Sequence, residues 1–355
     1  MDDDLLRLTP GPTEVPAAVR ERMSRAAWNP DVEPAFYAFY RDLVGKLEAV
    51  YGPNDVVILS GEGILGLEAA VASLVEAGDR VLCIANGRYG EGFADFVGLY
   101  GGEAVVCRSP STGGYDLERI EAELEAGSFD VATMVHCETP TGVLNDLEPV
   151  LELLEAHEVV SVVDAVSSLG GTPVPAARID VCIGATQKCF SAPPGLTVLS
   201  VSERAWERIE SFETRSYYAD LAPWREALEN EWFPYSHAVS NLLALDAAVD
   251  LLLEEGLESV FARHEACAER CRERARAVGL ETYPEHDGLA SPTVTALSLE
   301  GASAVSQRVR EEHGIVLATG LGEHEDDILR IGHMGHNARL EHVVRAMDAL
   351  EAVLA

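Results

Sequence analysis

Short runs of apolar, often β-branched residues recur between about residues 55 and 202, and longer segments with helical spacing separate them. The runs are apolar throughout rather than alternating with polar residues, which is typical of strands buried on both faces of a mostly parallel sheet. The pattern predicts an α/β domain with a seven-stranded, mostly parallel sheet. Its expected strands are Val56–Ser60, Arg80–Ala85, Ala104–Ser109, Val131–Cys137, Val159–Val166, Val181–Ala185 and Leu196–Ser202.

The strand rhythm stops after Ser202, where helical pieces and then a long helix, Val239–Glu255, are predicted. A chain of 355 residues is long for a single core. We therefore predict a large domain over residues 1–255 and a smaller C-terminal α/β domain over residues 256–355. The elements expected in the smaller domain are helices Leu257–Val278, Ala304–His313 and Ala338–Leu354, and strands Thr293–Leu297, Ile315–Leu317 and Ile328–Ile331.

Acidic residues outnumber basic ones by 60 to 26, which gives a formal net charge of −34. This charge excludes electrostatic binding to nucleic acid or to an anionic membrane. It is typical of proteins in a salt-rich cytoplasm, as in halophiles, where ions screen the repulsion. The acidic N-terminus does not resemble a secretory signal, and no apolar run approaches the roughly 20 residues of a membrane helix. We expect a cytoplasmic protein whose seven widely spaced cysteines are reduced and buried.

Lysine is almost absent, because Lys46 and Lys188 are the only lysines among the 26 basic residues. Lys188 lies in an apolar stretch flanked by glycine. Arginine does not deprotonate in proteins, so it cannot replace a lysine that attacks a carbonyl. The retention of a lysine at position 188 indicates that an amine is needed there.

A glycine-rich turn, Ser60–Gly66, connects a predicted strand to a predicted helix and satisfies the spacing G-x-G-x-x-G. Such a turn presents backbone N–H groups to a phosphate at a helix N-terminus. A dinucleotide site would also need an acidic residue about 20 positions later, where the chain has Asn86-Gly87. Phosphate binding is favoured over dinucleotide binding. The alternative is a turn whose glycines serve only the packing of helix on strand.

Asp164 lies within an apolar strand, where an unpaired carboxylate would be costly to bury. A protonated pyridine nitrogen would provide a cationic partner, and the ion pair would strengthen the ring as an electron sink. The alternative is an Asp that caps the following Ser167-Ser168 turn. Lys188 follows the next predicted strand, so Asp164 and Lys188 form a plausible pair.

Motifs along nearly the whole chain resemble the class V aminotransferases of fold type I, in the alanine–glyoxylate and serine–pyruvate branch. The resemblance implies pyridoxal 5′-phosphate as the cofactor and a contribution of residues 1–20 to the active site. The matching segments are Leu8–Pro12, Ser60–Glu68, Asn86–Gly90, His136–Leu144, Val163–Pro173, Thr186–Leu196 and Arg330–Gly335.

The resemblance also implies a role for individual residues. Lys188 would carry the cofactor and Asp164 would hold its pyridine nitrogen. Arg330 would bind the substrate carboxylate, which its planar guanidinium fits through two hydrogen bonds. The other implied contacts are the backbone of Gly63 and Ile64 with the phosphate, Tyr89 stacked on the ring, Thr139 near the ring hydroxyl, and Gln187 beside the phosphate.

Relatives of this kind share their active sites across a homodimer, and the segment Trp232–His237 resembles the one that reaches the neighbouring phosphate. Ser236 matches a hydroxyl position of that segment, whereas Phe233 stands where many relatives have Tyr or Thr. Trp28-Asn29 replaces a commonly basic pair. Glu62 stands where Ser or Thr is common, and a carboxylate there would repel the phosphate unless it turned away.

The predicted activity is ping-pong transfer of an amino group from a small neutral amino acid, of the alanine or serine class, to glyoxylate or pyruvate. A lyase or desulfurase of the same fold is an alternative, although desulfurases usually have His where this chain has Gln187. An NAD-linked oxidoreductase would lack its ribose acid, and a non-catalytic interaction protein would have no use for Lys188. No metal site is expected, because His333 and His336 lack nearby acidic or cysteine partners.

Overall fold

The structure, a computed structural model, describes residues 5–25 and 28–355, and its centre is a seven-stranded sheet. The strand order is β2-β10-β9-β8-β5-β3-β4, and β10 alone runs against the others. The predicted seven-stranded, mostly parallel sheet is therefore confirmed. The strands are β2 (Asp55–Ser60), β3 (Arg80–Ala85), β4 (Glu103–Arg108), β5 (Val131–Val135), β8 (Val160–Asp164), β9 (Val181–Ala185) and β10 (Leu196–Val201).

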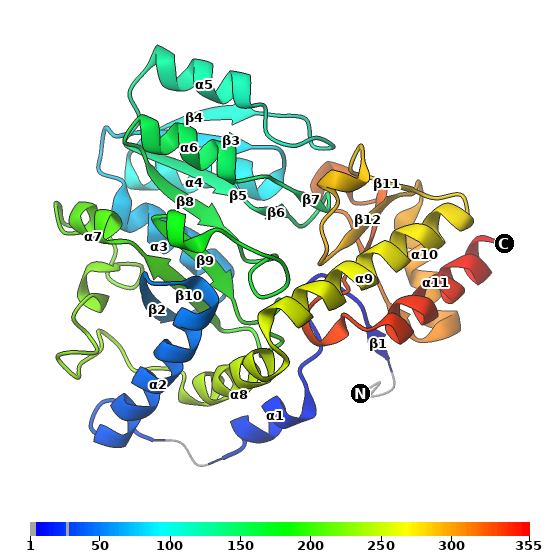
Figure 1. Cartoon of the computed structure of the whole chain (residues 1–355), viewed down its shortest axis with the longest axis horizontal. Coiled ribbons are helices and arrows are strands. Elements are labelled where there is room, and N and C mark those ends of the chain that lie inside the picture. The colour runs from blue at the N-terminus through cyan, green and yellow to red at the C-terminus, as the bar shows by residue number, and fades with distance from the viewer. Residues whose placement is uncertain (1–4, 26–27) are drawn as a thin grey trace.

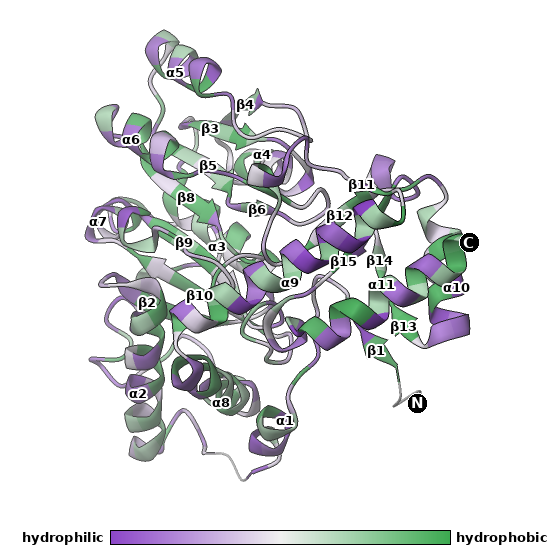
Figure 2. Ribbon diagram, turned by 45° about the vertical axis from the view of Figure 1, so that its right-hand side comes forward, coloured by the Kyte–Doolittle hydropathy of each residue, from purple (hydrophilic) through white to green (hydrophobic). Residues whose placement is uncertain are grey.

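Helices cover both faces of this sheet (Figure 1). Right-handed connections place α3 and α4 on one face and α5 and α6 on the other. The strands between them are mostly apolar in Figure 2, and all five residues of β8 are buried. The helices of this part of the chain are α1 (Ala17–Met23), α2 (Pro34–Tyr51), α3 (Gly63–Leu74), α4 (Arg88–Tyr100), α5 (Leu117–Ala126), α6 (Glu148–Ala156), α7 (Glu203–Ile209) and α8 (Val239–Glu255).

Several predicted strands are shorter than expected: Val159–Val166 is observed as Val160–Asp164, and Val131–Cys137 as Val131–Val135. The apolar run Val131–Cys137 belongs to the large sheet only as far as Val135. The His136 N–H still donates to the Asp164 carbonyl of β8 at 2.8 Å, and the chain then turns away. The following residues form a hairpin of β6 (Cys137–Glu138) and β7 (Val143–Leu144). This hairpin begins at the carboxyl edge of the sheet.

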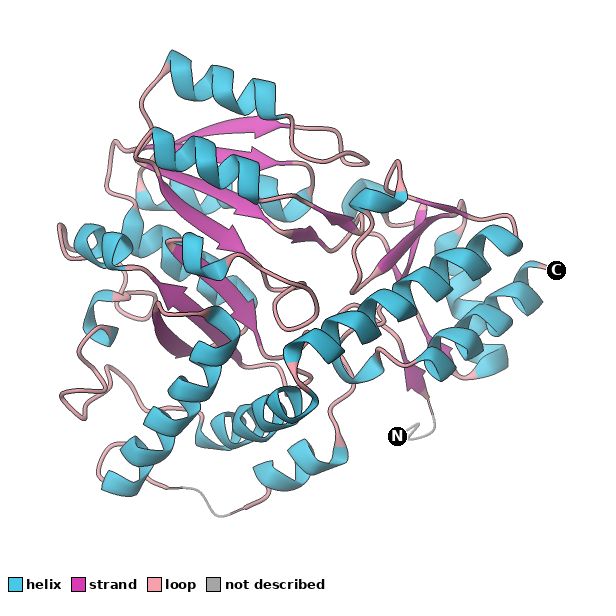
Figure 3. Ribbon diagram, in the orientation of Figure 1, coloured by secondary structure: helices cyan, strands magenta, loops and turns pink. Residues whose placement is uncertain are grey.

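A second group of strands and helices follows α8 (Figure 3). It contains an antiparallel sheet of order β11-β12-β15-β14 and a separate apolar core that includes Leu297, Leu329 and Met347. The division near residue 255 stays a prediction; α8 ends at Glu255 and α9 begins at Leu257. The elements are α9 (Leu257–Ala277), β11 (Glu281–Thr282), β12 (Thr295–Ser298), α10 (Ala302–His313), β13 (Ile315–Val316), β14 (Ala318–Thr319), β15 (Ile328–Ile331) and α11 (Leu340–Leu354).

The N-terminal segment belongs to both groups of elements. Strand β1 (Leu6–Arg7) pairs in parallel with β13, and Leu8 is fully buried in the second core. The chain then crosses to the large sheet, where the Thr13 N–H donates to the Gln187 carbonyl at 2.9 Å. Residues 9–13 therefore run past the carboxyl end of β9.

All seven cysteines are free thiols and all are buried. Burial raises the pKa of each thiol above its usual value, because an apolar interior disfavours the thiolate. The prediction of reduced, buried cysteines is confirmed.

None of the helices described here combines the length and apolar composition of a membrane span.

The charge of −34 leads to a prediction about salt. Many arginines already lie in exposed ion pairs, such as Arg274 with Asp348 at 2.7 Å and Arg308 with Glu312 at 2.9 Å. Salt weakens these pairs, but each contributes only about 0–1 kcal/mol. Screening of the excess negative charge stabilises the folded state instead, and it acts over the whole surface. We expect the thermal midpoint of unfolding to rise between low and molar KCl; a flat or falling midpoint would contradict this.

Candidate active site

Seven of the predicted site residues line one cavity of about 260 Å³ at the carboxyl edge of the large sheet. They come together because the carboxyl ends of parallel strands meet at one edge, where α/β proteins bind their ligands. The residues follow five different strands: Gly63 and Ile64 after β2, Tyr89 after β3, Thr139 after β5, Asp164 at the end of β8, and Gln187 and Lys188 after β9.

Lys188 is held by the N-terminal segment. Its Nζ donates to the Pro10 carbonyl at 2.6 Å, and a Cβ on Gly11 would lie 2.4 Å from its Cδ. Burial lowers the pKa of Lys188, and the nearby Asp164 carboxylate opposes this only in part. A lysine with a lowered pKa is more often neutral, and the neutral amine is the form that attacks a carbonyl.

Asp164 is buried at the end of β8, and its side chain accepts a hydrogen bond from the Val166 N–H at 2.9 Å. Burial raises the pKa of Asp164 to about 6, although this hydrogen bond and Lys188 both favour the carboxylate. A bound cation would lower that pKa again. The site is therefore suited to a protonated ring nitrogen, in agreement with the hypothesis drawn from the sequence.

Glu138 is a site residue that the sequence analysis did not single out. Its fully buried carboxylate accepts from the backbone N–H groups of Tyr89 and Gly90 at 3.0 and 3.2 Å, at the start of α4. Burial raises its pKa to about 7. Gly87 makes room for it, since a Cβ there would lie 2.4 Å from the Glu138 Cγ. Glu138 positions Tyr89. Its signals in the sequence were a carboxylate directly after an apolar strand and its place in the matching segment His136–Leu144.

Arg330 comes from β15 of the second sheet and is 7% exposed. It is not among the described residues that line either cavity, and it contacts the smaller cavity through Thr139. Its Nε donates to the Thr319 carbonyl at 2.6 Å and its Nη1 to the Thr139 carbonyl at 3.4 Å. Burial lowers the pKa of Arg330 to about 10. The remaining N–H groups of the fixed guanidinium provide donors for a carboxylate.

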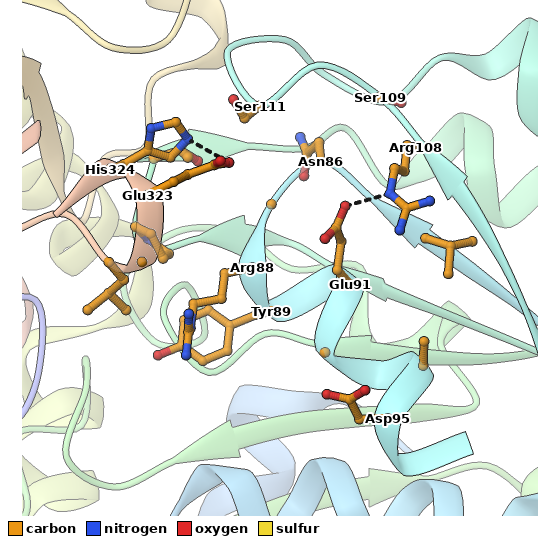
Figure 4. A pocket seen from close by; sticks show the side chains of 18 of the residues that line it. Asn86, Arg88, Tyr89, Glu91, Asp95, Arg108, Ser109, Ser111, Glu323 and His324 are labelled. Carbon is orange, nitrogen blue, oxygen red and sulfur yellow. Dashed lines mark hydrogen bonds and ion pairs between the residues drawn. The ribbon is translucent and has the colours of Figure 1, made fainter. Parts of the chain in front are cut away.

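A larger cavity of about 1200 Å³ adjoins the first and shares Ile64, Leu67 and Tyr89 with it. Figure 4 shows Arg88 and Tyr89 next to each other on the first turn of α4, and it also shows the ion pair of Glu91 on α4 with Arg108 on β4. Arg88 is exposed and lines only this larger cavity, whereas Tyr89 lines both. Tyr89 therefore lies where the two cavities meet.

The phosphate end of the smaller cavity differs from the sequence expectation. Glu62 does not turn away from the N-terminus of α3: its carboxylate accepts from the Ile64 N–H and from the Gln187 Nε2, each at 3.2 Å. Gly66 serves packing, because a Cβ there would lie 2.4 Å from the Thr197 Oγ1 on β10. Gly66 therefore serves the packing of helix on strand, which was the alternative role for the glycine-rich turn.

Ser236 does not line the cavity of its own chain. Its hydroxyl donates to Asp31 at 2.8 Å, and nearby Phe233 stacks on Tyr37 with ring centroids 5.6 Å apart. The contribution of this segment to a neighbouring subunit stays a prediction.

Two buried histidines bond to groups of the protein itself. His333 is hydrogen-bonded to the Thr295 hydroxyl at 2.7 Å, and His264 accepts from the Gly335 N–H at 2.9 Å.

The family model described as Aminotransferase class-V matches residues 36–346. The chain therefore belongs to the class V aminotransferases, and it has the fold type I architecture predicted from the sequence. Aminotransferases of this class and fold depend on pyridoxal phosphate, which agrees with the predicted cofactor.

Individual relatives share almost the whole chain. A pyridoxamine–pyruvate transaminase of Mesorhizobium japonicum is 36% identical, covering 98% of this chain and 91% of the relative. The crystal structure of pyridoxamine–pyruvate aminotransferase from Mesorhizobium loti has a TM-score of 0.95 at 34% identity, with 98% and 91% of the two chains covered. An alanine–glyoxylate aminotransferase from Nostoc has a TM-score of 0.95 at 30% identity, with 99% and 95% covered.

The two ends of the cavity fit this cofactor unequally. Asp164 and Lys188 suit a pyridine ring that bears an aldehyde, and Tyr89 is available to stack on it. The phosphate end does not fit in the same way, since the Glu62 carboxylate already occupies the N–H group of Ile64. A phosphate would need that same donor.

Proposed function

We propose that this aminotransferase moves the amino group of a small neutral amino acid, of the alanine or serine class, to glyoxylate or pyruvate in two half-reactions. The observation that carries this proposal is the placement of Lys188 and Asp164 in one cavity with Arg330 beside it. The names of the relatives support the acceptors, since they include a pyruvate and a glyoxylate aminotransferase.

Each of these residues has a defined task. The vitamin B6 ring, when bound, supplies an electron sink for the carbon that loses its proton. Asp164 keeps the ring nitrogen protonated through the ion pair. Arg330 orients the substrate carboxylate, and the freed Lys188 amine takes up and returns the proton at the reacting carbon.

The choice of amino donor follows from the available cations. A dicarboxylic donor needs a second positive group for its distal carboxylate, because burying that charge unpaired would be costly. Arg330 is committed to the α-carboxylate. Arg108 is paired with Glu91 at 2.7 Å, and Arg88 is exposed in the larger cavity. Small neutral donors need no second cation and are therefore favoured.

Comparing kcat/KM for alanine, serine, aspartate and glutamate tests this choice. We expect kcat/KM for alanine or serine to exceed that for both dicarboxylates by about tenfold or more. A tenfold difference corresponds to a cost of about 1.4 kcal/mol for one unpaired charge. A preference for either dicarboxylate would contradict the proposal. In that case Arg88→Gln would abolish the preference if Arg88 is the second carboxylate-binding group, whereas the matched control Arg108→Gln would not.

A second amino donor, pyridoxamine, is suggested by the name of the Mesorhizobium relatives. The position of Glu62 at the phosphate end favours it. An assay with pyridoxamine and either keto acid tests this directly. Repeating the assay with an amino acid as donor separates transamination from the lyase and desulfurase alternatives, because only transamination stops when the keto acid is left out.

The proposed enzyme works as a cytoplasmic homodimer with shared active sites, in which Ser236 of each chain approaches the cavity of the other. The exposed aromatic side chains of Tyr217, Tyr218 and Trp232 support an interface near this segment. Equilibrium sedimentation measures the assembly. A Ser236→Ala variant that changed neither cofactor affinity nor activity would remove the shared hydroxyl from the proposal.

A further inference from the structure

Glu62 places a carboxylate at the N-terminus of α3, where a phosphate group would otherwise bind. One carboxylate oxygen accepts from the Ile64 N–H and the other from the Gln187 Nε2, each at 3.2 Å. Although Glu62 is exposed, it lines the same cavity as Asp164 and Lys188. The carboxylate thus stands in for an anionic ligand and uses the donors that such a ligand needs.

The charges around the cavity also disfavour a phosphate. Among the described residues that line it, the ionisable carboxylates are Glu62 and Asp164, and the only cationic side chain is Lys188. When its nitrogen binds an aldehyde, Lys188 no longer has a free ammonium group that could pair with a phosphate. The α3 N-terminus provides roughly half a positive charge, which is already less than the charge of the Glu62 carboxylate and cannot balance an added dianion. A phosphate ester would therefore have to displace Glu62 or share the helix end with it.

Gln187 indicates what the cavity accepts instead. A carboxylate only accepts hydrogen bonds, so Glu62 fixes the Gln187 amide with its NH₂ group toward the carboxylate. The amide oxygen, Oε1, is buried and has no donor among the described residues. A phosphate dianion has no hydrogen to give, whereas a hydroxymethyl group donates one hydrogen bond and accepts another.

We infer that this site selects the vitamin B6 ring without its phosphate ester, and that Glu62 is the residue that determines the selection. The ring's hydroxymethyl group replaces the phosphate and lies beside the Glu62–Gln187 pair, where it donates to the Gln187 Oε1. This inference rests on the proposed aminotransferase function and narrows it to a ring that is unphosphorylated.

A ring without a phosphate anchor leaves after one half-reaction, so it is itself a substrate. Pyridoxamine then takes the place of the amino acid donor, and in the reverse direction alanine is the donor and pyridoxal the acceptor. Pyridoxamine and pyruvate then give pyridoxal and alanine. The exocyclic carbon of the ring loses its C–N bond and is oxidised to the aldehyde, and the keto carbon gains a C–N and a C–H bond and is reduced. Water taken up at the ring carbon balances water released at the keto carbon, and no outside oxidant is needed.

The test compares pyridoxal with pyridoxal phosphate as ligands of the purified protein. Each is titrated while the absorbance of the lysine-bound ring is followed, and borohydride trapping with mass spectrometry confirms Lys188 as the bound residue. For the wild-type protein we expect pyridoxal to bind about tenfold or more tightly than pyridoxal phosphate. Glu62→Ser, which removes both charge and bulk, is expected to shift the ratio of the two affinities toward the phosphate by about 100-fold. Glu62→Gln, which removes only the charge, is expected to give part of that shift.

Glu76→Gln is the matched control, because it removes the same charge from an exposed position just beyond the other end of α3. Its affinity ratio is expected to equal that of the wild type. A wild-type protein that prefers pyridoxal phosphate, or a ratio that Glu62→Ser leaves unchanged, overturns the inference while leaving the aminotransferase proposal intact. If neither ring attaches to Lys188, the proposed function fails as well.

Discussion

Lys188→Ala is expected to abolish the covalent attachment of the ring and to lower transamination by about four orders of magnitude. The variant removes both the amine that binds the aldehyde and the base that moves the proton. Borohydride reduction followed by peptide mass spectrometry locates the label, and single-turnover kinetics measures the loss. Lys188→Arg is expected to be equally inactive, since a guanidinium keeps its proton.

Lys46 is the natural control for this experiment. Its ammonium group lies within 3.0 Å of Asp42, Asp246 and Asp250, and these carboxylates raise its pKa despite partial burial. It is therefore a protonated, structural lysine, and Lys46→Arg is expected to leave the label on Lys188. A label found on Lys46 or on the N-terminal amine would show that the assignment of Lys188 is wrong.

Asp164→Asn is expected to retain the ring but to lose several kcal/mol of stabilisation of the carbanion, which lowers kcat/KM about 1000-fold. An amide of the same shape cannot hold the pyridine nitrogen in its protonated form. The absorbance spectrum tests retention, and steady-state kinetics tests the loss. Wild-type turnover by this variant would exclude Asp164 from the mechanism.

Asp180→Asn is the control that shows whether removing a buried carboxylate elsewhere in the chain would also lower kcat/KM. Asp180 is also buried, but it forms an ion pair with Arg204 and accepts from the Ser161 N–H at 2.8 Å, away from the cavity. Arg204 and hydrogen bonds hold its pKa below the usual value despite burial. We expect this variant to lose stability and to keep kcat/KM in its folded fraction.

The central sheet was predictable because each of its strands is an apolar run of five or six residues. By contrast, β1 and β13 have two residues each and pair across more than 300 positions, so no local pattern predicts them. Asp164 and Lys188 were predictable because their chemistry conflicts with their apolar surroundings. The roles of Glu62 and Glu138 depend on which N–H groups they meet after folding, and that information lies outside their own segments.

The burial of every native thiol makes this chain a clean background for site-directed labelling. A maleimide reagent should react slowly with the intact protein, and its rate should report how often the interior opens. One cysteine introduced at an exposed position, such as Leu99 at 66% exposure on α4, would then be the single fast-reacting group. A fluorophore could be placed in this way without first removing any cysteine.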